Sequence, residues 1–316
     1  MGELTGERIL IALGGNAMTA RDGSATPASQ RRAVTAAMER VGDLVAAGAQ
    51  IVLTHGNGPQ VGNLLMKNQQ AAHVVPPVPL DWCGAQTQAT IGVLIMNALE
   101  RALAVRDVAR PVSVLVSRTL VDADDPGFKD PQKPIGRYFA EAEARRFMEL
   151  GQSWKGFGDR GWRRVVASPE PVEILEGPAV EALMGAGHIV VAAGGGGVPT
   201  VRGPGGTLRG VEAVIDKDLA GRLLARQVAA TTFVIATDVE HVMIGYGTSK
   251  ARPLTRVTPA ELADHAARGE FAQGSMGPKV TAARRFVADG GKRAIITSLD
   301  QIAEAVRGTA GTIVEE

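Results

Sequence analysis

The chain has 316 residues, of which 45% are hydrophobic and only 4% aromatic, and its formal net charge is +1. This near-neutral charge gives no support for a nucleic-acid or membrane surface, so neither kind of partner is expected. The single cysteine, Cys83, excludes an internal disulfide and a Cys-based zinc site. No apolar run is long enough for a signal peptide or a membrane span, and we therefore expect a cytoplasmic protein.

The first third of the chain alternates between apolar β-branched runs and longer amphipathic segments. Strands are predicted at residues 8–13, 50–54 and 111–116, and helices at 27–47, from about 60, and at 82–104. The first two strands end in glycine turns, Gly14-Gly15-Asn16 and His55-Gly56-Asn57-Gly58. This alternation is typical of an α/β fold with a mostly parallel sheet that helices cover on both faces.

The segment from residue 117 to about 171 interrupts the alternation. It is rich in charged residues, proline and glycine, and it contains Trp154 and Trp162. Long connections of this kind usually have a function. We therefore expect an inserted subdomain that acts as a lid at one edge of the sheet.

The stretch from residue 188 to 225 carries the densest set of chemical signals. An apolar strand at 188–193 leads into Gly194 to Gly197, and Asp216-Lys217-Asp218 opens a helix that continues through residues 219–225. Glycines at a strand end let backbone N–H groups approach an anion, and a lysine between two aspartates is a cation held in place. The stretch predicts a phosphate or carboxylate site, although a glycine-rich loop beside a surface charge cluster explains it equally well.

A second set of strand and helix signals follows a boundary near residue 227. Strands are predicted at 232–237, 241–244 and 294–297, and helices at 259–268 and 280–289, the first capped by Thr258. We therefore expect two parts, residues 1–226 and 227–316. Open sheets of this type bind ligands at the carboxyl ends of their strands, where the glycine turns fall.

Several familiar motifs are missing from the sequence. There is no Gly-x-x-x-x-Gly-Lys-Ser/Thr and no Gly-x-Ser-x-Gly, and Pro199 and Thr200 stand where a dinucleotide fingerprint needs a glycine and a helix start. The five histidines lack metal-ligand spacing, so no metal site is predicted. His55 alone, because it lies in a Gly/Asn turn, is weighed evenly between packing and function.

Phosphoryl transfer needs positive charge around the moving group, and lysines can supply it without a P-loop. Lys217 and Lys279 are the main candidates because both adjoin turns at predicted strand-to-helix junctions. The inserted segment offers Lys133 or Lys129 as a third cation.

Seven motifs resemble those of the carbamate kinases, a branch of the amino acid kinase family. They lie at residues 14–17, 55–65, 133–136, 158–163, 194–199, 210–218 and 274–279, and the match is collinear from about residue 8 to 314. The resemblance implies an open three-layer αβα sandwich of two lobes. Residues 1–226, including the lid at about 117–171, would hold the phosphoryl acceptor, and residues 227–316 would bind ATP or ADP.

The resemblance also implies the reaction and the partners. Carbamoyl phosphate and ADP would give carbamate and ATP reversibly, with Mg²⁺ carried by the nucleotide. A homodimer is expected, and arginine metabolism is one pathway that could supply the substrate.

The same resemblance assigns roles to individual residues. Lys133 and Lys217 would neutralise the phosphoryl oxygens, Lys279 would stabilise the transition state, and Asp218 would orient the lysines. The substrate-binding residues would be Gly14, Gly15, Asn16, Gly56, Asn57, Gly58, Gly194, Gly195, Gly196 and Gly197. The nucleotide-binding residues would be Asp216, Thr237, Asp238, Tyr246, Ser275 and Met276.

Other functions remain open on the sequence alone. The same fold could phosphorylate another small carboxylate or a phosphonate, or it could serve as a non-catalytic nucleotide sensor. A nicotinamide dehydrogenase is a more distant alternative because its fingerprint is missing.

Overall fold

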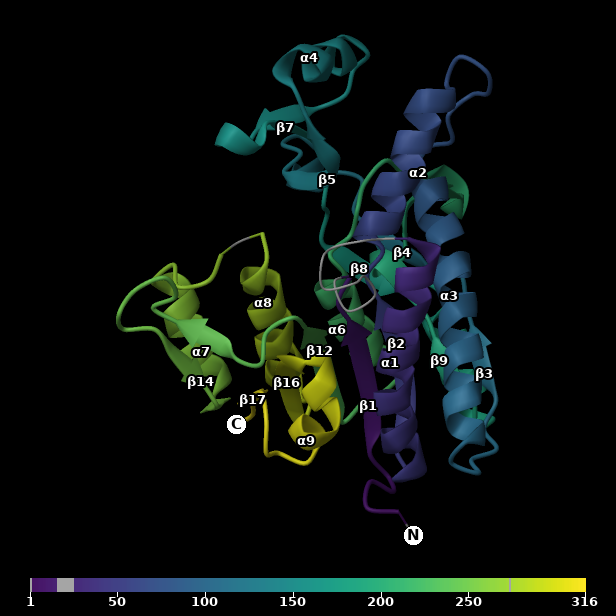
Figure 1. Ribbon diagram of the computed structural model, residues 1–316, viewed down its shortest axis with the longest axis vertical. Coiled ribbons are helices and arrows are strands. Elements are labelled where there is room, and N and C mark those ends of the chain that lie inside the picture. The colour runs from purple at the N-terminus through teal and green to yellow at the C-terminus, as the bar shows by residue number, and fades with distance from the viewer. Residues whose placement is uncertain (1, 16–25, 273) are drawn as a thin grey trace.

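The structure is a computed structural model that describes residues 2–15, 26–272 and 274–316. An eight-stranded sheet forms its centre (Figure 1). In spatial order the strands are β15 (Arg256–Val257), β17 (Thr312–Val314), β16 (Arg293–Ser298), β12 (Thr232–Thr237), β1 (Arg8–Leu13), β2 (Gln50–His55), β9 (Ile189–Val191) and β3 (Val112–Val114). Neighbouring strands run parallel except for β16 and β17.

Helices cover both faces of this sheet, because its strand residues alternate between two hydrophobic cores. In β1, Leu10 and Ala12 belong to one core, whereas Ile9, Ile11 and Leu13 belong to the other. The first core contains residues of α5 (Gly177–Gly185), α6 (Lys217–Gln227), α7 (Pro259–Ala267) and α8 (Met276–Ala288). The second contains residues of α1 (Pro27–Ala46), α3 (Leu80–Ala104) and α9 (Ile302–Val306). The predicted three-layer α/β architecture is confirmed.

The central sheet is continuous across the boundary expected near residue 227. β1 pairs with β2 on one side and with β12 on the other, so the two parts of the chain share one sheet. The chain builds outward from β1 through β2 and then returns to add β12 beside β1. Such a reversal of strand order leaves a crevice at the carboxyl ends of the strands, where ligands bind.

A smaller sheet lies beside the main one, and it includes both ends of the segment that was predicted to be inserted. It consists of β11 (Leu208–Gly210), β10 (Val198–Arg202), β4 (Arg118–Val121) and β8 (Pro171–Ile174). The segment predicted at 117–171 is therefore too wide, because β4 and β8 at its two ends belong to this sheet. β8 pairs with β4, and β4 pairs in turn with β10, a long-range partner that local composition does not reveal.

The part that projects from the body in Figure 1 is shorter, and we call it the lid. It comprises β5 (Lys133–Phe139), α4 (Glu141–Glu149), β6 (Trp154–Gly156) and β7 (Trp162–Val166). Its aromatic residues pack on one another: the Trp154 ring lies 5.3 Å from Phe139 and 5.4 Å from Phe147, centroid to centroid. At the base of the lid, Ile135 packs with Val61 of α2 (Gly58–Ala71).

The remaining elements are short. A hairpin joins β13 (Val242–Ile244) to β14 (Arg252–Leu254). Single turns of 3₁₀ helix are η2 (Pro126–Phe128), η3 (Gly158–Arg160), η4 (Gly194–Gly196), η5 (Pro204–Gly206) and η6 (Leu299–Gln301). Among the described residues, no helix is long and apolar enough to cross a membrane.

Most predicted elements occur in the structure, but several boundaries differ. The predicted ends of β1 and β12 are confirmed, and so is the cap of α7, where Thr258 and Glu261 form a capping box. Helices α2 and α8 begin earlier than predicted, because Pro59 and Pro278 both fit a first helical turn. Conversely, the strands predicted at 111–116 and 188–193 are shorter, at three residues each.

Candidate active site

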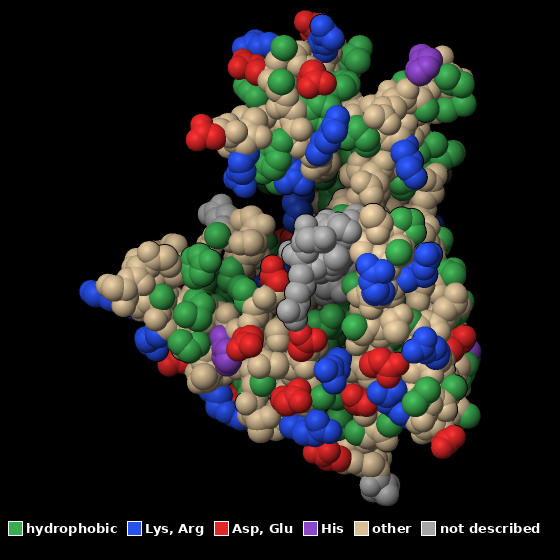
Figure 2. Space-filling view, viewed as in Figure 1, with side chains coloured by type: hydrophobic (Ala, Val, Ile, Leu, Met, Phe, Trp, Pro, Cys, Tyr) green, Lys and Arg blue, Asp and Glu red, His purple; other side chains and the backbone are tan. Residues whose placement is uncertain are grey.

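A cavity of about 390 Å³ opens at the carboxyl ends of β1, β2 and β12. Gly14 and Gly15 follow β1, Gly56 follows β2, and Thr237 ends β12; all four line the cavity. Figure 2 shows a notch between the lid and the C-terminal part of the molecule, with Lys and Arg side chains at its inner end. The cavity therefore lies in the crevice that the sheet topology predicts.

The N-terminus of α2 faces this cavity. Gly58 and Pro59 in its first turn both line it. The preceding residue, Asn57, makes no side-chain cap and instead donates from Nδ2 to the Thr87 hydroxyl at 2.9 Å. An uncapped helix N-terminus presents free N–H groups and partial positive charge, which together favour an anion.

The Gly194–Gly197 run is required by its protein neighbours. A Cβ at position 194 would overlap the His55 ring, one at 195 would overlap the Asn57 side chain, and one at 197 would overlap the Thr119 hydroxyl. Gly195 and Gly197 also line the cavity, whereas positions 194 and 196 do not. The absence of side chains in this run therefore lets the side chains of His55, Asn57 and Thr119 pack directly against its backbone.

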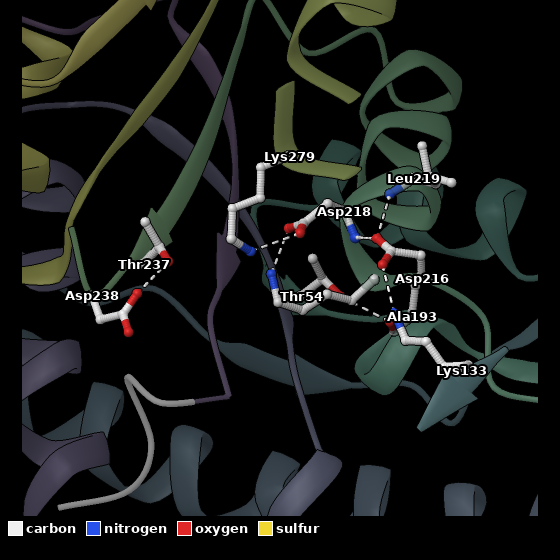
Figure 3. Close-up of polar contacts among 10 residues, drawn as sticks. Thr54, Lys133, Ala193, Asp216, Asp218, Leu219, Thr237, Asp238 and Lys279 are labelled. Atoms are coloured by element: carbon white, nitrogen blue, oxygen red, sulfur yellow. Dashed lines mark hydrogen bonds and ion pairs between the residues drawn. The ribbon is translucent and has the colours of Figure 1, made fainter. Parts of the chain in front are cut away.

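Asp218 holds two lysines at the inner end of the cavity. Its Oδ1 accepts a hydrogen bond from Lys217 Nζ at 2.5 Å. Its Oδ2 accepts one from Lys279 Nζ at 2.9 Å (Figure 3). Burial alone would raise the pKa of Asp218, but the charges of both lysines outweigh it and lower that pKa to about 2. Burial also lowers the pKa of Lys217, with the Asp218 carboxylate opposing this and the charge of Lys279 adding to it.

Asp216 connects the lid to the start of α6. Its Oδ1 accepts from the backbone N–H groups of Asp218 and Leu219, which caps the helix, while its Oδ2 accepts from Lys133 Nζ at 2.8 Å. Figure 3 shows Lys133 and Lys279 approaching this segment from different elements. Both carboxylate oxygens of Asp216 are thus engaged by the protein, although Asp216 also lines the cavity, and its contact with a nucleotide stays a prediction.

Of the other residues predicted to bind the nucleotide, three line the cavity and two do not. Thr237, Asp238 and Ser275 line the cavity, and the Thr237 hydroxyl donates to Asp238 Oδ1 at 3.0 Å. Tyr246 is 81% exposed on the turn after β13, and Met276 packs against a hydrophobic core, so neither lines the cavity. Asn16, predicted to bind the phosphoryl group, lies outside the described residues.

The lid contributes one predicted and one unpredicted cation. Lys133 lines the cavity and Lys129 does not, so the geometry favours Lys133 as the lid lysine. Arg163 of β7 also lines the cavity, although the predicted site did not include it. Arg163 ends the motif at residues 158–163, one of those that resemble the carbamate kinases, and that position is the signal in the sequence that points to it.

Lys217 and Lys279 both lie within helices rather than before them. α6 begins at Lys217 and α8 at Met276, so each ammonium group is anchored in the first turn of its helix.

His55 is buried at the end of β2, with Nδ1 3.0 Å from the Gly56 carbonyl oxygen. Across the described ranges, no group of three or more His, Cys, Asp or Glu residues is arranged to hold a metal ion.

The cavity combines two lysines on one aspartate, a third lysine from the lid and a helix N-terminus without a side-chain cap. These features are typical of an oxyanion site, here in a three-layer α/β protein whose sequence has no P-loop motif.

Comparison with known proteins identifies the class more closely. Residues 7–298 match the model of the amino acid kinase family. The chain is 45% identical to a carbamate kinase of Thermococcus kodakarensis over 311 residues, which is 97% of this chain and 98% of the relative. The chain belongs to the amino acid kinase family.

Solved structures agree with this assignment. A carbamate kinase from Giardia lamblia bound to AMP-PNP is 39% identical and superposes with a TM-score of 0.92, covering 98% of each chain. A protein from Aeropyrum pernix K1 is 42% identical with a TM-score of 0.94, covering 98% of this chain and 99% of its own.

Proposed function

We propose that this protein is a carbamate kinase, which transfers a phosphoryl group reversibly between carbamoyl phosphate and ADP to give carbamate and ATP. The observation that carries the proposal is the pair of lysines, Lys217 and Lys279, held by one buried aspartate in the cavity. Full-length similarity to carbamate kinases supports this acceptor over another small carboxylate or a phosphonate.

The chemistry needs charge stabilisation more than proton transfer. In the direction of ATP formation, the bond from phosphorus to the carbamoyl oxygen breaks, and a bond from phosphorus to a β-phosphate oxygen of ADP forms. Carbamate leaves as a weakly basic carboxylate anion, so no general acid is required. The negative charge on the transferring group is met by Lys217 and Lys279 from the body and by Lys133 from the lid.

The glycine turns would hold the acceptor side of the substrate. Gly14, Gly15, Gly56 and Gly58 line the cavity beside the open N-terminus of α2. Their backbone N–H groups would bind the oxygens of carbamoyl phosphate, and Asn57 would fix the turn through its bond to Thr87.

The nucleotide would lie toward residues 227–316, near Thr237, Asp238 and Ser275. The AMP-PNP complex of the Giardia lamblia relative supports nucleotide binding by this fold. Mg²⁺ would take its ligands mainly from the nucleotide phosphates and water, since Asp216 and Asp218 are engaged by lysines. We further propose a cytoplasmic homodimer, on the resemblance to carbamate kinases.

The test is ATP formation from ADP and carbamoyl phosphate with Mg²⁺, measured by a coupled assay. Wild type is compared with Lys217→Ala and with Lys67→Ala, which removes an exposed lysine of α2. We expect Lys217→Ala to lose roughly 100- to 1000-fold in turnover and Lys67→Ala to lose little. If a well-folded wild type turns over another acyl phosphate but not carbamoyl phosphate, the acceptor is not carbamate but the acid of that acyl phosphate. ATP binding without turnover on any acceptor would indicate a nucleotide sensor.

A further inference from the structure

Arg163 enters the cavity from the lid in a fixed orientation. It lies on β7, is half-buried, and lines the cavity together with Lys133 of the neighbouring strand β5. Its Nε donates to the Gly136 carbonyl oxygen at 2.8 Å, and its guanidinium carbon lies 5.3 Å from the centroid of the Tyr138 ring. These two contacts hold the guanidinium plane while leaving its terminal nitrogens available to a ligand.

Among the described cations that line the cavity, Arg163 differs from the three lysines in having no carboxylate partner. Lys133 is paired with Asp216, and Lys217 and Lys279 are paired with Asp218. In the part of the chain that the structure describes, no carboxylate pairs with Arg163. The next residue along β7, Arg164, contrasts with it, because that side chain pairs with Glu212.

The neighbours of Arg163 place it on the acceptor side. Gly136, to which it is bonded, lies against Gly62 of α2, so close that a Cβ on Gly62 would be 3.4 Å from the Gly136 Cα. The open N-terminus of the same helix faces the cavity at Gly58. Arg163 therefore borders the end of the cavity lined by the glycine turns that are proposed to hold the acceptor side of the substrate.

We propose that Arg163 is an oxyanion-binding residue of the lid, which contacts the phosphoryl group of the acceptor-side substrate. A guanidinium offers two parallel N–H donors that match two oxygens of a phosphate. The identity of the anion as carbamoyl phosphate depends on the function proposed above, whereas recognition of a phosphate-like anion by Arg163 does not.

The kinetic test compares Arg163→Gln and Arg163→Lys with Arg160→Gln. Arg160 is a matched control because it stacks on the same Tyr138 ring at 5.4 Å but is exposed and does not line the cavity. In Arg163→Gln we expect KM for carbamoyl phosphate to rise roughly 10- to 100-fold while KM for MgADP changes little. Arg163→Lys should recover part of the loss, and Arg160→Gln should resemble wild type. Equal changes in both KM values, or none, would overturn the proposal.

A binding test separates this proposal from the proposed function. Inorganic phosphate should raise the melting temperature of wild type and of Arg160→Gln, and Arg163→Gln should need roughly tenfold more phosphate for the same shift. If wild type makes no ATP from carbamoyl phosphate yet shows this difference, the proposed function fails and the role of Arg163 stands. If phosphate protects Arg163→Gln as well as it protects wild type, or protects neither, Arg163 is not an anion ligand.

Discussion

The ammonium group of Lys133 lies 2.8 Å from Oδ2 of Asp216, and the other oxygen of that carboxylate caps helix α6. The two residues are 83 positions apart in the chain. This single carboxylate therefore joins the lid to the helix that carries Lys217. Asp216 thus has two roles, an ion pair with Lys133 and the N-cap of α6, and separate substitutions can test each role.

Asp216→Asn should keep the cap and lose the charge, whereas Asp216→Ala should lose both. Asn and Asp are comparable N-caps, and removal of such a cap costs about 1 kcal/mol. We expect the free energy of unfolding, from urea denaturation, to be about 1 kcal/mol lower for the Ala variant than for the Asn variant. Equal stability of the two variants would show that the cap contributes nothing.

Asp218→Asn should damage both stability and turnover. It leaves the ammonium groups of Lys217 and Lys279 partly buried without their shared carboxylate. Breaking a buried ion pair in this way costs about 3–5 kcal/mol. The control is Glu141→Gln, which breaks an exposed pair with Arg145 on α4 and should cost about 0.5 kcal/mol or less. A loss no larger than that of the control would contradict the central place given to Asp218.

Gly194→Ala should destabilise the fold through a clash with His55. The added methyl group would overlap a ring that is itself buried, and overpacking of this kind costs about 1–3 kcal/mol. Gly185→Ala is the matched control: it lies in α5 with open space around its Cβ position, and it should stabilise by up to about 1 kcal/mol. In a His55→Ala background the cost at position 194 should shrink, and an unchanged cost would place the strain elsewhere.

His55 should make stability depend on pH below neutrality. Burial, with a contribution from the charge of Lys217, lowers the pKa of His55 from 6.5 to about 4. Between these values the unfolded chain binds a proton that the folded protein does not. The contribution of the neutral His55 to the free energy of unfolding is therefore fully present above pH about 6.5 and is lost as the pH falls toward 4. The loss is about 1.4 kcal/mol per pH unit and about 3 kcal/mol in total.

The measurement is the free energy of unfolding across this range for wild type, His55→Asn and His73→Asn. Removal of His55 should flatten the profile, whereas substitution at His73, which is exposed, should leave it unchanged. Parallel profiles for wild type and His55→Asn would refute a buried neutral imidazole.

The sequence was sufficient for the architecture because its signals are local. Apolar β-branched runs ending in glycine predicted the ends of β1 and β12, and Thr258 followed by Glu261 marked the start of α7. Those patterns depend on strand and helix periodicity and on capping, which involve residues close together in the chain. The three lysines of the cavity were also predicted, since each adjoins a recognisable turn or motif.

Only the tertiary structure decided which residues meet. It limited the lid to the part between β5 and β7, because β4 pairs with β10 of the body and β8 pairs with β4 in the same sheet, and it added Arg163 to the cavity. It also showed that the glycines after β9 accommodate His55, Asn57 and Thr119. These outcomes depend on contacts between residues far apart in the chain, and local propensity carries no information about such partners.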